Sequence, residues 1–166
     1  GVARALAGDP PVLLMDEPFG AVDPVVRARL QDEVLHLLRS LRKTVLIVTH
    51  DVEEAVRLGD AVAVLRAGRL LRHAPAAEIL ADPGDPFVAE FLGADRALTR
   101  LGLFILADAP RRPEAASGTP LPPGTSLRDA LAAMLAAGVR ALPVTDGGSV
   151  TLDDLLTFGG GPSRAA

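Results

Sequence analysis

The stretch Val12-Leu-Leu-Met-Asp-Glu17 decides the fold that we expect for this 166-residue chain. Its four apolar residues lie between the turn-forming Gly8-Asp-Pro-Pro11 and two carboxylates. A short apolar run between such signals is typical of a strand buried on both faces, as in a parallel sheet. Thr44-Val-Leu-Ile-Val-Thr49 is a second run of this kind, and it ends at His50. The sequence therefore predicts two buried strands that each lead into polar side chains.

Helical segments are expected after each of these strands. Asp23 followed by Pro24 is typical of a helix start, with an N-cap and proline at the first helical position. Asp51 and Glu54 have the spacing of a capping box, which predicts a second, short helix. The order strand, helix, strand, helix favours parallel strands joined by a right-handed crossover. The first helix has an apolar stripe at helical spacing, formed by Val26, Leu30, Val34, Leu38 and Leu41.

The middle of the chain predicts a hairpin, two short helices and a linker. Residues 61–65 and 69–72 have the pattern of two strands joined across a tight turn. Residues 75–81 and 86–92 are expected to be helical, the second with Phe87, Phe91 and Leu92 on its apolar side. Residues 108–124 hold five of the 14 prolines, which is typical of a linker.

The end of the chain predicts a small α+β unit. Ser126 is expected to cap an amphipathic helix that buries Leu127, Ala130, Leu131, Met134 and Leu135, and Thr151 is expected to cap the helix over residues 152–158. Residues 141–144 are expected to form a short strand. The segment between Asp146 and Thr151 is expected to be too short to form both a turn and a further strand.

Composition excludes several classes of protein. The net charge is −4 and no stretch is strongly basic, so a phosphate-backbone binder is not expected. Aromatic residues make up only 3% of the chain, which disfavours stacking on single-stranded nucleic acid. The chain has no cysteine, so disulfides, cysteine zinc sites and thiol nucleophiles are excluded. No apolar run approaches the ~20 residues of a membrane span, which predicts a soluble cytoplasmic protein or the cytoplasmic subunit of a larger one.

The polar residues at the two strand ends are the candidates for chemistry. Ligand crevices lie outside the carboxyl ends of parallel strands, where Asp16, Glu17 and His50 are expected on one rim. Adjacent carboxylates point opposite ways, so one could hold magnesium while the other orients or deprotonates a water. A neutral His50 could donate to a phosphate oxygen or fix that water. The alternative is that the acidic pair only solvates a strand end and that the histidine caps or packs.

These residues together resemble a known family. Val12-Leu-Leu-Met-Asp-Glu-Pro-Phe-Gly-Ala-Val-Asp-Pro24, followed by Val48-Thr-His-Asp51, is similar to the ATP-binding subunits of ABC transporters. The resemblance covers residues 1–92, and residues 1–7 look like the helix downstream of the family's signature loop. Residues 19–23 and 87–96 look most like importers of quaternary amines such as glycine betaine.

The resemblance implies a role for each candidate residue. Asp16 corresponds to the aspartate that holds Mg²⁺ through water, and Glu17 corresponds to the catalytic base. Asp23 belongs to the loop that communicates across the nucleotide-sandwich dimer. His50 corresponds to the histidine that contacts the γ-phosphate of ATP. The implied partners are a second ATPase subunit, as a homodimer, and transmembrane permease subunits, at the cytoplasmic face of the plasma membrane and without nucleic acid.

The end of the chain carries a second resemblance. Ser126-Leu-Arg-Asp-Ala-Leu131, Ala141-Leu-Pro-Val-Thr-Asp146 and Val150-Thr-Leu-Asp-Asp-Leu155 look like one cystathionine-β-synthase-type (CBS) motif. Importers of this class often carry such motifs as C-terminal sensors of ionic strength or nucleotide. The alternative is a vestigial packing domain.

The phosphate-binding loop of the family does not occur in this sequence. There is no G-x-x-x-x-G-K-[ST] pattern, and Lys43, the only lysine, lacks flanking glycines. We therefore expect the C-terminal portion of a longer subunit, inactive in isolation because it cannot grip ATP.

The expected fold class is α/β. A parallel-sheet, P-loop-type core without its N-terminal half is followed by a small α+β CBS-like module. The expected boundaries are 1–92 for the ATPase portion, 93–123 for a linker, 124–158 for the partial CBS-like module and 159–166 for a disordered tail. The competing hypothesis is a non-catalytic CBS-type regulatory fragment that senses nucleotide or ionic strength.

Overall fold

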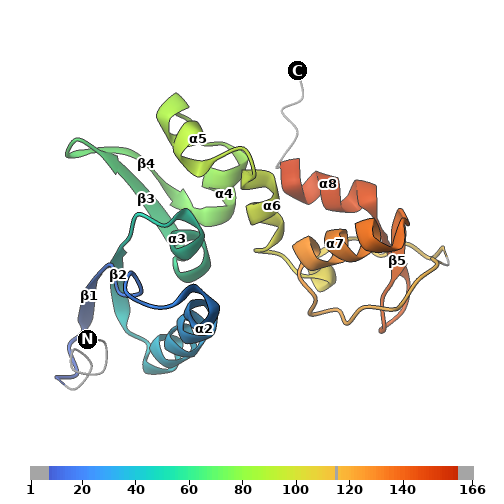
Figure 1. Cartoon of the computed structure of the whole chain (residues 1–166), viewed down its shortest axis with the longest axis horizontal. Coiled ribbons are helices and arrows are strands. Elements are labelled where there is room, and N and C mark those ends of the chain that lie inside the picture. The colour runs from blue at the N-terminus through green and yellow to red at the C-terminus, as the bar shows by residue number, and fades with distance from the viewer. Residues whose placement is uncertain (1–7, 115, 161–166) are drawn as a thin grey trace. The chain divides into compact units, whose positions relative to one another are not determined.

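The chain divides into two compact units, Gly1–Asp60 and Ala61–Ala166. The computed structural model in Figure 1 describes residues 8–114 and 116–160 of the chain. The helix expected over residues 1–7 and most of the tail expected over 159–166 lie outside the described residues. Within the described part, no helix is both long enough and apolar enough to cross a membrane.

The first unit is built on a two-stranded parallel sheet. Strand β1 (Val12–Asp16) pairs with β2 (Thr44–Val48), and the long helix α2 (Pro24–Leu41) connects them (Figure 1). Short helix α3 (Val52–Leu58) follows β2 and ends at Gly59. The predicted strands, their parallel pairing and both helices are therefore confirmed.

Helix α2 covers only one face of this sheet. Leu13, Met15 and Leu38 are buried together, and Val34, Val45 and Ile47 pack against them. The side chains that alternate with these on the strands remain exposed, by 50% to 73% of their surface; they are Val12, Leu14, Leu46 and Val48. The prediction of strands buried on both faces is wrong for the described residues, because no described element of the first unit packs on the second face.

The apolar stripe of α2 is only partly used. Leu38 is buried, whereas Val26, Leu30 and Leu41 are each at least 38% exposed. A sheet of two strands is narrower than an 18-residue helix is long, so only the middle of the stripe meets it.

The second unit opens with the predicted hairpin and two predicted short helices. Strand β3 (Ala61–Arg66) pairs antiparallel with β4 (Arg69–Pro75), and α4 (Ala76–Ala81) and α5 (Pro86–Leu92) follow. Helix α5 buries Val88 and Leu92 rather than its aromatic residues. Phe87 and Phe91 stack on each other with ring centroids 6.0 Å apart, and Phe91 is 45% exposed.

The rest of the second unit surrounds one hydrophobic core. Its elements are α6 (Arg96–Leu101), the 3₁₀ helix η1 (Leu106–Asp108), α7 (Leu127–Ala137), β5 (Ala141–Pro143), β6 (Ser149–Thr151) and α8 (Leu152–Gly160). The caps predicted at Ser126 and Thr151 are present: each hydroxyl oxygen accepts a hydrogen bond from the backbone N–H three residues later, at 3.0 and 3.3 Å. Helix α7 buries Leu127, Ala130 and Met134, but Leu135 is 71% exposed.

The segment expected to be a linker contributes to this core. Leu101, Leu106 and Ala109 are buried among the core residues. The Leu106 N–H donates to the Thr125 carbonyl at 2.8 Å, and α6 packs against both α4 and α8. The proline-rich composition of residues 108–124 suggested a linker, but the segment is anchored to the core by apolar residues just before and within it.

The prediction that no strand fits before Thr151 is wrong. Strand β6 has only three residues and pairs antiparallel with β5. Gly147 and Gly148 adopt φ values of 107° and 73°, which residues with a side chain rarely adopt, so the turn is very tight. The Val144 N–H donates to the Gly148 carbonyl at 3.0 Å, which closes that turn. A turn this compact leaves enough residues for the strand.

Candidate active site

The register of the first sheet brings two predicted site residues to one rim. Asp16 pairs with Val48 at the carboxyl ends of β1 and β2. The Glu17 N–H then donates to the Val48 carbonyl at 2.9 Å, so the strands remain paired one residue past β1. Two residues after Val48, the chain reaches His50, which places it opposite Glu17.

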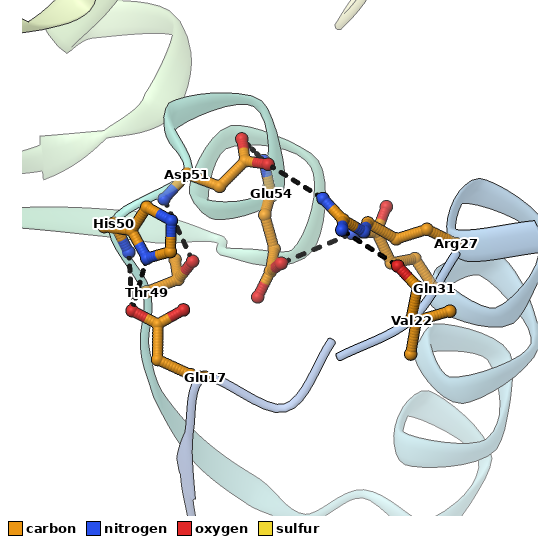
Figure 2. Close-up of polar contacts among 8 residues, drawn as sticks. All are labelled: Glu17, Val22, Arg27, Gln31, Thr49, His50, Asp51 and Glu54. Carbon is orange, nitrogen blue, oxygen red and sulfur yellow. Dashed lines mark hydrogen bonds and ion pairs between the residues drawn. The ribbon is translucent and has the colours of Figure 1, made fainter. Parts of the chain in front are cut away.

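Glu17 and His50 are in direct contact at this rim. Oε1 of Glu17 lies 2.7 Å from Nδ1 of His50, and the His50 backbone N–H donates to the same oxygen at 3.1 Å (Figure 2). The His50 side chain is 82% exposed and that of Glu17 is 40% exposed. The predicted proximity of these two residues is confirmed, and their catalytic roles stay predictions.

An unusual backbone conformation turns Glu17 out of the strand. Its φ of 44° lies in the left-handed region, which is uncommon for residues other than glycine. Gly20 closes the turn by donating its N–H to the Glu17 carbonyl at 3.2 Å, and Phe19 within the turn is buried. Such conformations persist where the surrounding structure holds them, and they are concentrated at functional sites.

The contact changes the acidity of the imidazole. The hydrogen bond to Glu17, and after it the negative charge of that carboxylate, raise the pKa of His50 above 6.5. The protonated imidazole can donate from Nδ1 to the carboxylate and keep Nε2–H for another acceptor. Because the folded-state pKa is raised, the stabilisation from this contact is fully present below pH 6.5. It is lost as the pH rises through the folded-state value.

Asp16 and Asp23 lie apart from this contact. Asp16 is exposed at the end of β1, on the sheet face opposite the buried Met15. The Asp23 carboxylate caps α2 by accepting the Val25 N–H at 2.8 Å. Among the described residues, no hydrogen bond or ion pair joins either aspartate to the pair at the rim, and no three acidic or histidine side chains gather as a metal site.

Several polar side chains near the rim were not identified as site residues from the sequence. Arg27 of α2 contacts the Val22 carbonyl and Asp51, and Gln31 contacts Glu54 (Figure 2). Gln31 and Glu54 are only 5% and 4% exposed. The four-residue spacing of Arg27 and Gln31 could have indicated that these two side chains lie together, because it places both on one side of the helix.

The C-terminal module has a second polar cluster. Asp154 is 4% exposed and accepts hydrogen bonds from the Arg112 guanidinium, the Thr151 hydroxyl at 2.7 Å and the Thr151 N–H at 3.1 Å. The hydrogen bond from Arg112 is the main cause that lowers the pKa of Asp154 to about 2. The carboxylate is therefore charged and paired within its own module, which makes it a structural contact.

Comparison with known proteins supports both resemblances. Residues 119–160 match the family model of the CBS domain. Over 146 residues the chain is 47% identical to the osmoprotectant import ATP-binding protein OsmV of Salmonella typhimurium, an alignment that includes 88% of this chain and 37% of that protein. It is 44% identical over 147 residues to the glycine betaine uptake system ATP-binding protein YehX of Escherichia coli, covering 88% of this chain and 48% of YehX.

A third relative matches a shorter part of the chain. The glycine betaine/carnitine/choline transport ATP-binding protein OpuCA of Bacillus subtilis is 50% identical over 96 residues, which are 58% of this chain and 25% of that protein. The predicted resemblance to ATP-binding subunits of quaternary-amine importers, together with a CBS motif, is confirmed. The chain spans less than half the length of each of these relatives.

The Glu17–His50 contact predicts a measurable titration. In the chain itself, His50 should titrate above pH 6.5, and Glu17→Gln should lower its pKa because the negative hydrogen-bond acceptor is lost. A pH series of histidine-selective NMR spectra would measure both values. Glu33→Gln is the matched control, because Glu33 is an exposed carboxylate paired with Arg29 on α2. An unchanged His50 pKa in the Glu17 variant would contradict the contact.

Proposed function

We propose that this chain is part of the ATP-binding subunit of an ABC importer and carries its catalytic residues Glu17 and His50. The proposed importer takes up glycine betaine or another quaternary amine. The observation that carries the proposal is the contact of the Glu17 carboxylate with the His50 imidazole at the carboxyl ends of β1 and β2. The names of the similar proteins from Salmonella, E. coli and Bacillus support the importer class and the chemistry of the solute.

In this proposal Glu17 is the general base for the attacking water. Among the described residues, its hydrogen bonds to His50 all use Oε1, so Oε2 is the oxygen that would take the proton. Two contacts from one residue hold the carboxylate in a fixed orientation. Orientation matters here because phosphoryl transfer to water depends mainly on positioning and electrostatics.

His50 would stabilise charge on the terminal phosphate. Its raised pKa keeps a larger fraction of the imidazole protonated near neutral pH, and its ring is largely exposed at the rim. The Nε2–H group would donate to a phosphate oxygen while Nδ1 faces Glu17.

Asp16 fits the role of a magnesium ligand in part. Its carboxylate is exposed at the strand end, as a ligand acting through water would be, and it belongs to no cluster of three ligands among the described residues. Bound Mg²⁺ would neutralise negative charge on the nucleotide phosphates. Asp23 is proposed to act at the interface with a second ATPase subunit while it caps α2.

The proposed partners and location follow from the same class of protein. We propose a homodimer of ATPase subunits bound to transmembrane permease subunits at the cytoplasmic face of the membrane. We also propose that a longer polypeptide supplies the phosphate-binding loop, since the 166-residue sequence has none. In the isolated chain, ATP hydrolysis is then expected to be absent.

Substitution of Glu17 tests the central assignment. In a chimera that joins the N-terminal part of OsmV to this chain, Glu17→Gln should lower ATP turnover by about 10²–10⁴-fold, the usual share of a general base. Binding of ATP should survive, because the amide keeps the size of the carboxylate. His50→Ala should cause a comparable loss, and Asp16→Asn should weaken the dependence on magnesium. A steady-state ATPase assay over a series of magnesium concentrations would measure the turnover of all three variants.

The control is the 166-residue chain without the N-terminal part. Calorimetric titration with ATP and magnesium should give no binding above background, because no glycine-rich loop is present to hold the phosphates. Micromolar affinity, or full turnover of the Glu17→Gln chimera, would contradict the proposal.

A regulatory role is a second candidate, favoured by the C-terminal module. Residues 119–160 match the CBS domain, and β5 and β6 pair antiparallel despite their shortness. If this module senses nucleotide or ionic strength, it should pair with a second copy in a ligand-dependent way.

Size-exclusion chromatography separates the two candidates. The regulatory hypothesis predicts that adenine nucleotide or added salt shifts the chain from monomer to dimer. An elution volume that does not respond to either would contradict it.

A further inference from the structure

One arginine links the two segments that carry the candidate pair. Nη2 of Arg27, on α2, donates to the Val22 carbonyl at 2.9 Å, and Nη1 lies 3.8 Å from Oδ2 of Asp51 (Figure 2). Val22 belongs to the loop that leaves Glu17, and Asp51 directly follows His50. The guanidinium therefore bridges the loop after β1 and the turn after β2.

We infer that Arg27 is a positioning residue that braces the 17–23 loop against the His50 turn and thereby maintains the contact between Glu17 and His50. The inference rests on the proposed function only for its catalytic meaning. The brace itself consists of the contacts of Arg27 with the Val22 carbonyl and with Asp51, which all lie in the first unit.

The surroundings of Arg27 suit such a brace. Its side chain is 28% exposed and that of Asp51 is 35% exposed, so the ion pair is only partly screened by water. A planar guanidinium presents its donors from separate nitrogens in a rigid fork, whereas the three donors of an ammonium group share one nitrogen and rotate. Asp51 is itself held, because its carboxylate caps α3 by accepting the Glu54 N–H at 3.2 Å. Movement of Asp51 would therefore move the start of α3 and the adjacent His50.

A buried contact lies one turn further along α2. Gln31 Nε2 is 3.5 Å from Oε2 of Glu54, a long hydrogen bond between two buried side chains. The Glu54 side chain does not complete the predicted capping box, since the Asp51 N–H donates to the Thr49 hydroxyl at 3.1 Å. Burial raises the pKa of Glu54. The first turn of α3 is thus attached to α2 at Asp51 and at Glu54.

The far end of α3 offers a matched control. Arg57 Nη2 donates to Asp32 of α2 at 2.8 Å, in an exposed ion pair. Arg27 and Arg57 carry the same charge, and each joins α2 to the α3 segment. Of these two arginines, Arg27 is the one that contacts Asp51, the residue next to His50.

The test measures the pKa of His50 in the 166-residue chain by NMR for Arg27→Ala, Arg27→Lys and Arg57→Ala. The charged groups that act on His50 are Glu17, Asp51 and Glu54, all acidic. Loss of a nearby positive charge would, by electrostatics alone, raise the pKa of His50 or leave it unchanged. Loss of the brace would lower it toward 6.5, because the hydrogen bond to Glu17 weakens. The two effects have opposite signs.

We expect Arg27→Ala to lower the pKa of His50 toward 6.5, and Arg57→Ala to leave it in place. Arg27→Lys keeps the positive charge but replaces the planar guanidinium fork with a single ammonium nitrogen, so it should give an intermediate value, and it serves if the alanine variant does not fold. An unchanged or raised pKa in the folded Arg27 variants, or an equal fall in Arg57→Ala, would overturn the inference. This readout needs no ATP, so it stands or falls separately from the hydrolysis proposed for Glu17 and His50.

Discussion

The parallel register of β1 and β2 is the constraint on which the candidate site depends. Pairing of Asp16 with Val48 fixes where each strand ends, and the bond from the Glu17 N–H to the Val48 carbonyl extends the pairing by one residue. A slip of one residue would turn every side chain of a strand to the other face. Leu13 and Met15 would then leave the core under α2, so burial and the site are specified by the same register.

The chemistry at this rim is concentrated in few groups. One carboxylate oxygen receives both the side chain and the backbone N–H of His50, while the left-handed conformation of Glu17 directs it there. Side chains of α2 then hold the His50 turn, through the contact of Arg27 with Asp51 and the buried Gln31–Glu54 contact. In this way partly buried side chains fix the positions of the exposed residues at the rim.

What the sequence predicts here depends on the kind of signal. The meeting of Glu17 and His50 was predictable, because the carboxyl ends of neighbouring parallel strands share one edge. The roles of Arg27 and Glu54 were not, because polar residues on a helix usually face solvent and only the packed structure shows that Glu54 is buried. Strand β6 was missed because the tight Gly147–Gly148 turn saves residues that an ordinary turn would use. The anchoring of the predicted linker by Leu106 was likewise hidden by its composition.

A double-mutant cycle on Glu17 and His50 would measure the strength of their contact. The free energies of unfolding of the chain and of Glu17→Gln, His50→Ala and the double variant would be measured in urea at about pH 5.5 and at about pH 9. We expect a favourable coupling at the lower pH, where the imidazole is charged beside the carboxylate, and a smaller one at the higher pH. Additive effects of the two substitutions at both pH values would contradict it.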